Sequence, residues 1–171
     1  SNVTEALSDW YRHTVGDALV NLGAHRGLDL SEVRGPGNHR HLLLHPPEMP
    51  IVGSDPAVGI GVGWLATSAS PPGLSTFACV RRSDHRSAVE VARALMEAGG
   101  REVRSGIRDA RGKDDEAWPI WWWIAPGERW WTDLDAYCSS ITGEVRRLLD
   151  PLRDVLCDLA GPEIEDGSDP R

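Results

Sequence analysis

The sequence predicts a single α+β domain: one mostly antiparallel sheet of five to six strands with three helices, in the order α-β-β-β-α-β-β-α. Apolar residues recur at helical spacing near both ends and in the middle of the chain, and short apolar runs bounded by Gly and Pro lie between them. The chain has 171 residues, 40% of them hydrophobic and 26% charged, which suits one domain with its own core. We expect the domain over 3–161 and an acidic, disordered tail over 162–171.

Three helices follow from the apolar spacing, at about residues 4–22, 85–98 and 132–160. Thr4 and Thr132 are suitable N-cap residues for the first and the last. Pro151 should kink the last helix or start a second one. A short extra helical turn is expected over 28–33.

Strands are predicted at about residues 39–45, 57–65, 74–80, 102–108 and 118–124, with a short sixth strand at 130–131. The second strand carries Gly59, Gly61 and Gly63 on one face. Because these glycines lie inside a strand and not between a strand and a helix, they favour close packing over a nucleotide-binding loop. We expect a Trp of the fifth strand, or the first helix, to fill the space above them.

Six of the eight tryptophans lie in one short segment: Trp118, Trp121, Trp122, Trp123, Trp130 and Trp131. Together they would bury on the order of 1,000 Å², more apolar surface than a soluble monomer usually exposes. Strand alternation places Trp118 and Trp122 on one face, and Trp121 and Trp123 on the other. If the helices cover one face only, the other set must meet a partner. The alternatives are a strand buried on both faces, or an aromatic pocket for a small ligand.

The formal net charge of −8 argues against nucleic acid as a partner, and no segment approaches the length of a membrane span. The three cysteines lack metal or redox spacing and indicate reduced thiols in the cytoplasm. Lys113 is the only lysine, a bias that suggests a GC-rich bacterial genome.

Two groups of polar residues are candidate binding sites. His39 and His41 share a strand face and could hold a metal, but no third ligand completes the set, so we predict a polar, solvent-facing side of an edge strand and no cofactor. The arginines that could gather into an anion patch are Arg81, Arg82, Arg86, Arg104 and Arg108. Pairing with nearby carboxylates on a solvated face is the favoured interpretation of these arginines. No Ser or Cys lies in a nucleophile motif.

The predicted element order is similar to the core of restriction-endonuclease-like nucleases, which makes Asp55, ahead of the second strand, a candidate for their acidic residue. Those enzymes carry an Asp at the second strand and Glu-x-Lys on the third. Here the third strand reads Phe77-Ala78-Cys79-Val80-Arg81, which has neither residue, so we do not expect an active nuclease, and a degenerate relative stays an alternative. The order, size and acidity also resemble type III secretion chaperones, which are dimers that bind unfolded partner segments.

These observations predict a non-catalytic protein-binding or regulatory, chaperone-like module. We expect it to associate with itself, as a homodimer, or with another protein, through the Trp-rich strand and the C-terminal helix. The alternatives are a small-molecule-binding protein or enzyme with a Trp-lined pocket, or a degenerate nuclease-like domain.

Overall fold

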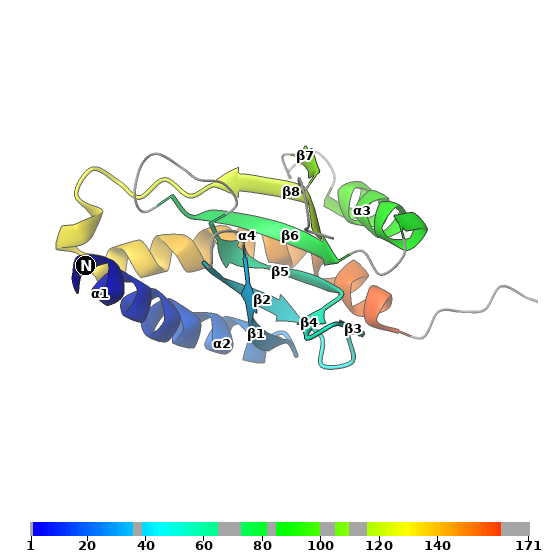
Figure 1. The fold of residues 1–171 in the computed structure, drawn as a ribbon, viewed down its shortest axis with the longest axis horizontal. Helices are drawn as coiled ribbons and strands as arrows, with labels where there is room; N and C mark the ends of the chain where they lie inside the picture. Colours follow the sequence, from blue (N-terminus) through cyan, green and yellow to red (C-terminus); the bar gives the residue numbers. More distant parts are fainter. Residues whose placement is uncertain are drawn as a thin grey trace, which may run out of the picture.

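The structure is a computed structural model that describes residues 2–35, 39–64, 73–81, 85–99, 105–109 and 116–161. The main elements follow the predicted order of a helix, a run of strands, a helix, two strands and a long helix (Figure 1). The helices are α1 (Asn2–Trp10), the π-helical turn η1 (Tyr11–Val15), α2 (Gly16–Ala24), α3 (His85–Gly99), the 3-10 turn η4 (Trp130–Thr132) and α4 (Leu134–Ala160). The strands are β1 (Asp29–Arg34), β2 (Arg40–His45), β3 (Ile51–Val52), β4 (Asp55–Pro56), β5 (Val58–Gly63), β6 (Ser75–Arg81), β7 (Ser105–Asp109) and β8 (Glu116–Trp123).

One six-stranded antiparallel sheet organises the molecule, with strand order β1-β2-β5-β6-β8-β7, and β3 pairs with β4 as a separate hairpin. This confirms the predicted α+β class. The prediction of a helical turn at 28–33 is wrong. Residues Asp29 to Arg34 form the strand β1, which pairs with β2 along its whole length. The pairing across a half-buried edge overrides the weak local preference of a short segment.

The N-terminal helix is continuous through α1, η1 and α2, and a tyrosine fastens it to the sheet. Tyr11, in the π-helical turn, is fully buried, and its hydroxyl lies 2.9 Å from the carbonyl oxygen of Val62 and 3.1 Å from that of Arg40. Its ring also packs edge-on to Trp64, at 4.7 Å between centroids. The contacts join the first helix to β5 and β2.

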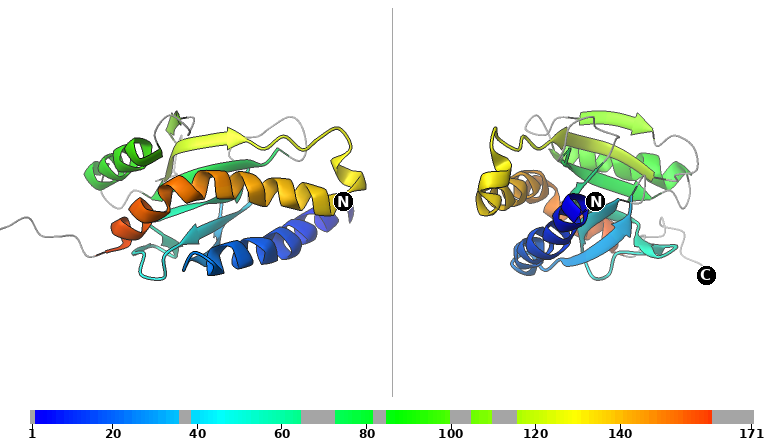
Figure 2. Two further views of the ribbon diagram at one scale, coloured as in Figure 1. Left: turned by 180° about the vertical axis from the view of Figure 1, so that it is seen from behind. Right: turned by 60° about the vertical axis from the view of Figure 1, so that its left-hand side comes forward.

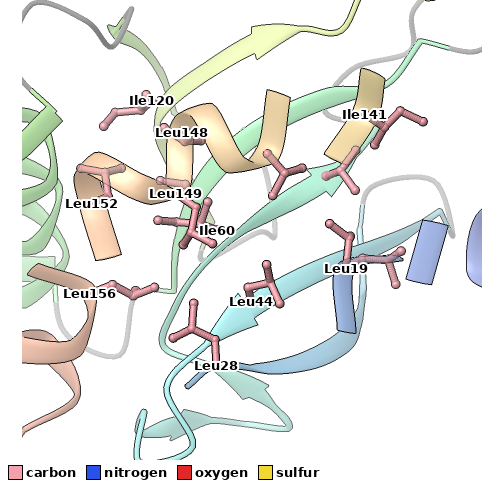
Figure 3. Packing of buried hydrophobic residues seen from close by; sticks show 14 of the residues in the cluster. Leu19, Leu28, Leu44, Ile60, Ile120, Ile141, Leu148, Leu149, Leu152 and Leu156 are labelled. Carbon is pink, nitrogen blue, oxygen red and sulfur yellow. The ribbon is translucent and has the colours of Figure 1, made fainter. Parts of the chain in front are cut away.

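The main core lies between one face of the sheet and the helices. The N-terminal helix and α4 lie on the same side of the sheet (Figure 2), and α3 packs against α4, β6 and β8. Figure 3 shows leucines of α4 directed at Ile60 of β5 and Ile120 of β8. The buried apolar stripe of α4 includes Ile141, Val145, Leu148, Leu149, Leu152 and Leu156. The stripe of the C-terminal helix is therefore buried within its own chain.

α4 runs without interruption from Leu134 to Ala160 and contains Pro151. Its ribbon changes direction in the last turns (Figure 2), as a proline inside a helix would cause. The N-cap is Asp133, whose side chain accepts a hydrogen bond from the backbone N–H of Ala136. The predicted cap, Thr132, lies one residue earlier and ends η4.

The other face of the sheet has a second cluster, which among the described residues is built from strands alone: Val33, Leu43, Phe77, Cys79 and Trp118, with Trp121 packed against it. We call this side the helix-free face. All members of the cluster except Trp121 are buried.

The glycines of β5 are on the helix-free face, where they let side chains of neighbouring strands meet above them. The rings of His41, on β2, and Phe77, on β6, lie 4.8 Å apart although β5 runs between their strands. Trp118 of β8 contacts both rings, at 6.5 and 6.4 Å. The packing interpretation is confirmed for the described residues, but the space is closed by His41, Phe77 and Trp118 together and not by the first helix.

The predicted alternation along β8 fails at one position. Two residues, Trp118 and Pro119, lie opposite the single Cys79 of β6, which is a β-bulge. Because proline has no N–H to donate to a ladder, strands accommodate it at such irregularities. The bulge turns Trp118 onto the same face as Trp121, while Ile120 and Trp122 face the helices.

Candidate protein-binding surface on the tryptophan strand

The six clustered tryptophans do not share one environment. Trp118 is buried in the core of the helix-free face. Trp122 is half-buried between β8 and α4. Trp123 and Trp131 are exposed by 44% and 59%, while Trp121 and Trp130 are half-buried beside them. Clustering in sequence is therefore not clustering in one site.

Trp121 and Trp123 form what we call the indole pair. Their rings lie 5.6 Å apart at an interplanar angle of 87°, an edge-to-face contact. They are on the helix-free face because they alternate with Trp122, which faces α4. Trp121 packs against the buried strand cluster, and the exposed Trp123 ring rests on Trp121.

Trp122 is held in place by polar contacts with α4. Its indole N–H donates to the Glu144 carboxylate at 2.8 Å, and the guanidinium of Arg147 lies 5.3 Å from its ring centroid. Arg147 also pairs with Glu144 at 3.5 Å. These contacts fix the strand carrying the indole pair against the long helix.

Trp130 and Trp131 do not form the predicted sixth strand, because they occupy the 3-10 turn η4 ahead of α4. Thr132 N–H donates to the carbonyl of Arg129 at 3.0 Å, which closes this turn locally. Their rings join two residues of other elements in a chain of edge-to-face contacts, Trp10–Tyr137–Trp130–Trp131, with centroid distances of 5.6, 5.4 and 6.0 Å. We call these four residues the aromatic corner.

A pocket of about 210 Å³ opens beside the aromatic corner, lined by residues that include Pro126, Arg129, Trp130, Asp133 and Tyr137. Burial raises the pKa of the Tyr137 phenol well above its ordinary value, so the hydroxyl keeps its proton. That hydroxyl is buried and has no hydrogen-bond partner among the described residues.

A larger depression of about 360 Å³ lies between the end of α2, the start of β1 and Pro47. Its walls are mainly apolar, with Val20, Leu28 and Leu30 among them, and Asp29 is the ionisable group in its lining. It lies apart from the tryptophans.

The two candidate metal ligands, His39 and His41, occupy different environments. His41 is fully buried, with its Nε2 3.3 Å from the carbonyl oxygen of Trp64, whereas His39 is exposed against the ring of Trp64. The expected solvent-facing side of an edge strand is wrong, because β1 covers the edge of β2 and the strand cluster covers that face. Among the described residues, no group of three His, Cys, Asp or Glu side chains could hold a metal ion.

His45, on the same face as His41, has a partner within the fold for each of its ring nitrogens. Its Nδ1 lies 2.8 Å from the carbonyl oxygen of Pro46, to which it must donate, and its Nε2 lies 2.7 Å from Ser31 Oγ. Both ring nitrogens of His45 are therefore engaged in hydrogen bonds within the protein.

Of the five arginines in the predicted anion patch, Arg81 is the one whose side chain the structure describes. Arg81 pairs with Asp55 at 2.8 Å, and both side chains are mostly buried. Asp55, the carboxylate suggested by the nuclease-like element order, is thus paired with a cation of the fold. Arg82 and Arg104, and the side chains of Arg86 and Arg108, lie outside what the structure describes, as does the tail 162–171.

Tyr137 and Trp10 are site residues that the sequence did not single out. Each occupies an apolar position of its helix, where a core role is the ordinary interpretation, and only the fold brings them together across more than a hundred residues.

Comparison with known proteins gave no match for this chain among protein-family models, curated proteins or solved structures. In the part of the chain that the structure describes, no helix combines the length and apolar character needed to cross a bilayer.

Proposed function

We propose that this protein is a non-catalytic protein-binding module, regulatory or chaperone-like in character, that associates through the indole pair. The observation that carries the proposal is the edge-to-face contact of Trp121 and Trp123 on the helix-free face, with Trp123 exposed by 44%. Tryptophan is enriched where binding energy concentrates at protein interfaces.

The face of the sheet that carries the indole pair is the one that no described helix covers. All the helical residues of the main core pack on the opposite face, so among the described residues the helix-free face relies on strands alone. Leaving a large part of an indole in water forfeits about 1.5–3 kcal/mol of burial. A protein surface placed over Trp123 would recover part of that free energy.

A second copy of the chain is the partner we expect first. Closed two-fold dimers are the commonest assemblies of soluble proteins, and a face presenting two neighbouring indoles can be self-complementary. A net charge of −8 disfavours nucleic acid. The apolar stripe of α4 lies in the core, so any contribution of the C-terminal helix comes from its exposed side.

The alternative of a small-molecule site has weaker support. The pocket walled by Trp130 measures about 210 Å³, below the roughly 300–1,000 Å³ of ordinary ligand sites. The three cysteines are free thiols, and we place the protein in the reducing cytoplasm on that basis.

Light scattering after size exclusion tests the proposal, using Trp123→Ser and the matched control Trp131→Ser, since both side chains are well exposed. We expect wild-type protein and the control to reach twice the 18.7 kDa chain mass as concentration rises. Trp123→Ser should stay at the single-chain mass with an unchanged circular dichroism spectrum. A wild-type protein that stays monomeric at every concentration, or a Trp123→Ser variant that dimerises like wild type, would contradict the proposal.

A further inference from the structure

We infer that the outer edge of β1 is a second binding surface, separate from the indole pair, and that it takes an extended peptide segment of a partner protein as an added strand. The segment alternates apolar with basic side chains. Three features carry this: a regular strand at the edge of the sheet, an apolar depression beside it, and an acidic residue in the lining of that depression.

The backbone of β1 offers the means of pairing. β1 stands at one end of the six-stranded sheet, and in the described part of the chain β2 is its one strand neighbour. The register with β2 is continuous from Asp29 to Arg34, without a bulge, and the strand contains no proline. Because a strand uses alternate backbone groups for each neighbour, the remaining N–H and C=O groups of β1 point away from β2. This row of donors and acceptors is complementary to the backbone of another extended chain.

The depression of about 360 Å³ lies where an apolar side chain of the added strand would fall. Its lining includes Leu30 of β1 and Val20 and Ala24 of α2, the helix that runs beside β1 (Figure 1). Leu30 packs with the main core and Val33 with the helix-free cluster, so residues of β1 face the two sides of the sheet in turn. An added residue opposite Leu30 therefore points towards α2, where it would cover Val20, which is exposed by 49%.

The charge beside the depression favours a basic residue in the bound segment. Asp29 is the ionisable residue of the lining; it is exposed and has no ion-pair partner among the described residues. Glu32, further along β1, is already paired with Arg12 at 2.9 Å and with Arg40 at 3.5 Å. A lysine or arginine opposite Asp29 gives the bound segment a pair of opposite charges across the two strands. Because Asp29 and Leu30 are consecutive and face opposite sides, a segment that fits both alternates basic with apolar side chains.

Amide hydrogen exchange, followed residue by residue in NMR spectra, tests the inference with the peptide acetyl-Thr-Val-Lys-Val-Lys-Val-Thr-amide as the probe. The control peptide has the same composition with its valines placed together, so that it carries the same charge without the alternation. We expect the alternating peptide to bind with a Kd of about 1 mM or lower. At about ten times that concentration, the β1 amides directed away from β2 should exchange about tenfold more slowly.

Two substitutions locate the peptide. Val20→Lys places a charge in the apolar wall and should weaken binding by about tenfold or more. The matched control, Asn21→Lys, adds the same charge at the next exposed position of α2, outside the lining, and should bind as wild type does. Asp29→Asn should weaken binding of the lysine peptide by about two- to fivefold, and should leave unchanged the binding of an analogue with glutamine in place of lysine.

The inference is overturned if the alternating peptide leaves the exchange of β1 unchanged at millimolar concentration, if the control peptide slows it equally, or if Val20→Lys binds like Asn21→Lys. It is also overturned if the β1 amides become protected as the protein is concentrated without peptide, since a second copy then occupies the edge. Trp123→Ser should bind the peptide as wild type does, so a failure of the indole-pair dimer and a failure of this inference are distinguishable.

Discussion

His41 and Phe77 lie on strands that are not neighbours, yet their rings meet 4.8 Å apart at an angle of 64°. The strand between them, β5, presents glycines on that face, and a Cβ at Gly63 would collide with the imidazole ring of His41. The missing side chains of β5 therefore make room for the cluster that supports Trp118 and, next to it, Trp121.

Gly61→Ala should be among the most damaging substitutions in the chain. A Cβ at this position would collide with the carbonyl oxygen of Leu42, which is backbone and cannot move aside. We expect a loss of about 3 kcal/mol in the free energy of unfolding, measured by urea denaturation. The matched control is Gly143→Ala on α4, whose Cβ would meet nothing within 4 Å and which should gain about 0.5–1 kcal/mol. Equal effects at the two positions would refute the close approach of β5 and β2.

Unfolding should depend on pH through His41. Burial lowers the pKa of this imidazole from 6.5 to about 4, so the unfolded chain binds its proton more readily than the folded chain. The contribution of His41 to stability is complete above about pH 6.5 and is lost as the pH falls towards 4, with a slope of up to about 1.4 kcal/mol per pH unit.

Urea midpoints of wild type and His41→Asn, taken between pH 7 and pH 4, measure this slope. The variant should be less stable at pH 7 but should show a flatter decline than wild type. His25→Asn, at an exposed position, should follow the wild-type curve. Parallel curves for wild type and His41→Asn would show that the imidazole titrates normally.

Glu144→Ala should destabilise the protein by about 1 kcal/mol, because it removes the acceptor of the half-buried Trp122 indole N–H. Asp154→Ala removes a carboxylate from an exposed pair with Arg153 on the same helix and should change stability by less than about 0.5 kcal/mol. Thermal unfolding of the two variants compares these effects. A larger loss in Asp154→Ala would contradict the role assigned to Glu144.

Asp55→Ala should cost about 2 kcal/mol, since it leaves the mostly buried guanidinium of Arg81 without this carboxylate. The double variant Asp55→Ala with Arg81→Met should recover part of that loss, because the mostly buried guanidinium that lost its Asp55 partner is then removed as well. Chemical denaturation of the single and double variants forms a mutant cycle. Strictly additive losses would show that the pair is not coupled.

Periodicity in the sequence is enough to predict the three helices and most strands of the sheet, because each has an apolar face that matches its repeat. The strand at Asp29–Arg34 is missed, since only pairing with β2 reveals it. The orientation of Trp118 is also missed. Its face depends on a bulge at Pro119 whose register is set by β6 and not by local sequence.

The tryptophan segment predicts buried apolar surface correctly but does not predict where each indole lies. Its composition predicts burial, and Trp118 is buried, but strand alternation divides the indoles only between the two faces of one sheet. The structure separates them because β8 ends at Trp123 and the chain continues to η4, where Trp130 packs on Tyr137. A contact between residues of different elements leaves no trace in the spacing of either element.

Fluorine NMR of protein labelled with 5-fluorotryptophan tests the central claim most directly, with the Trp123 resonance assigned through Trp123→Phe. Over a dilution series, this account predicts that the Trp123 resonance shifts with concentration and loses its solvent isotope shift when the protein is concentrated, while the Trp131 resonance stays constant. A Trp123 resonance that keeps one position and its full solvent isotope shift at every concentration would contradict association through the indole pair.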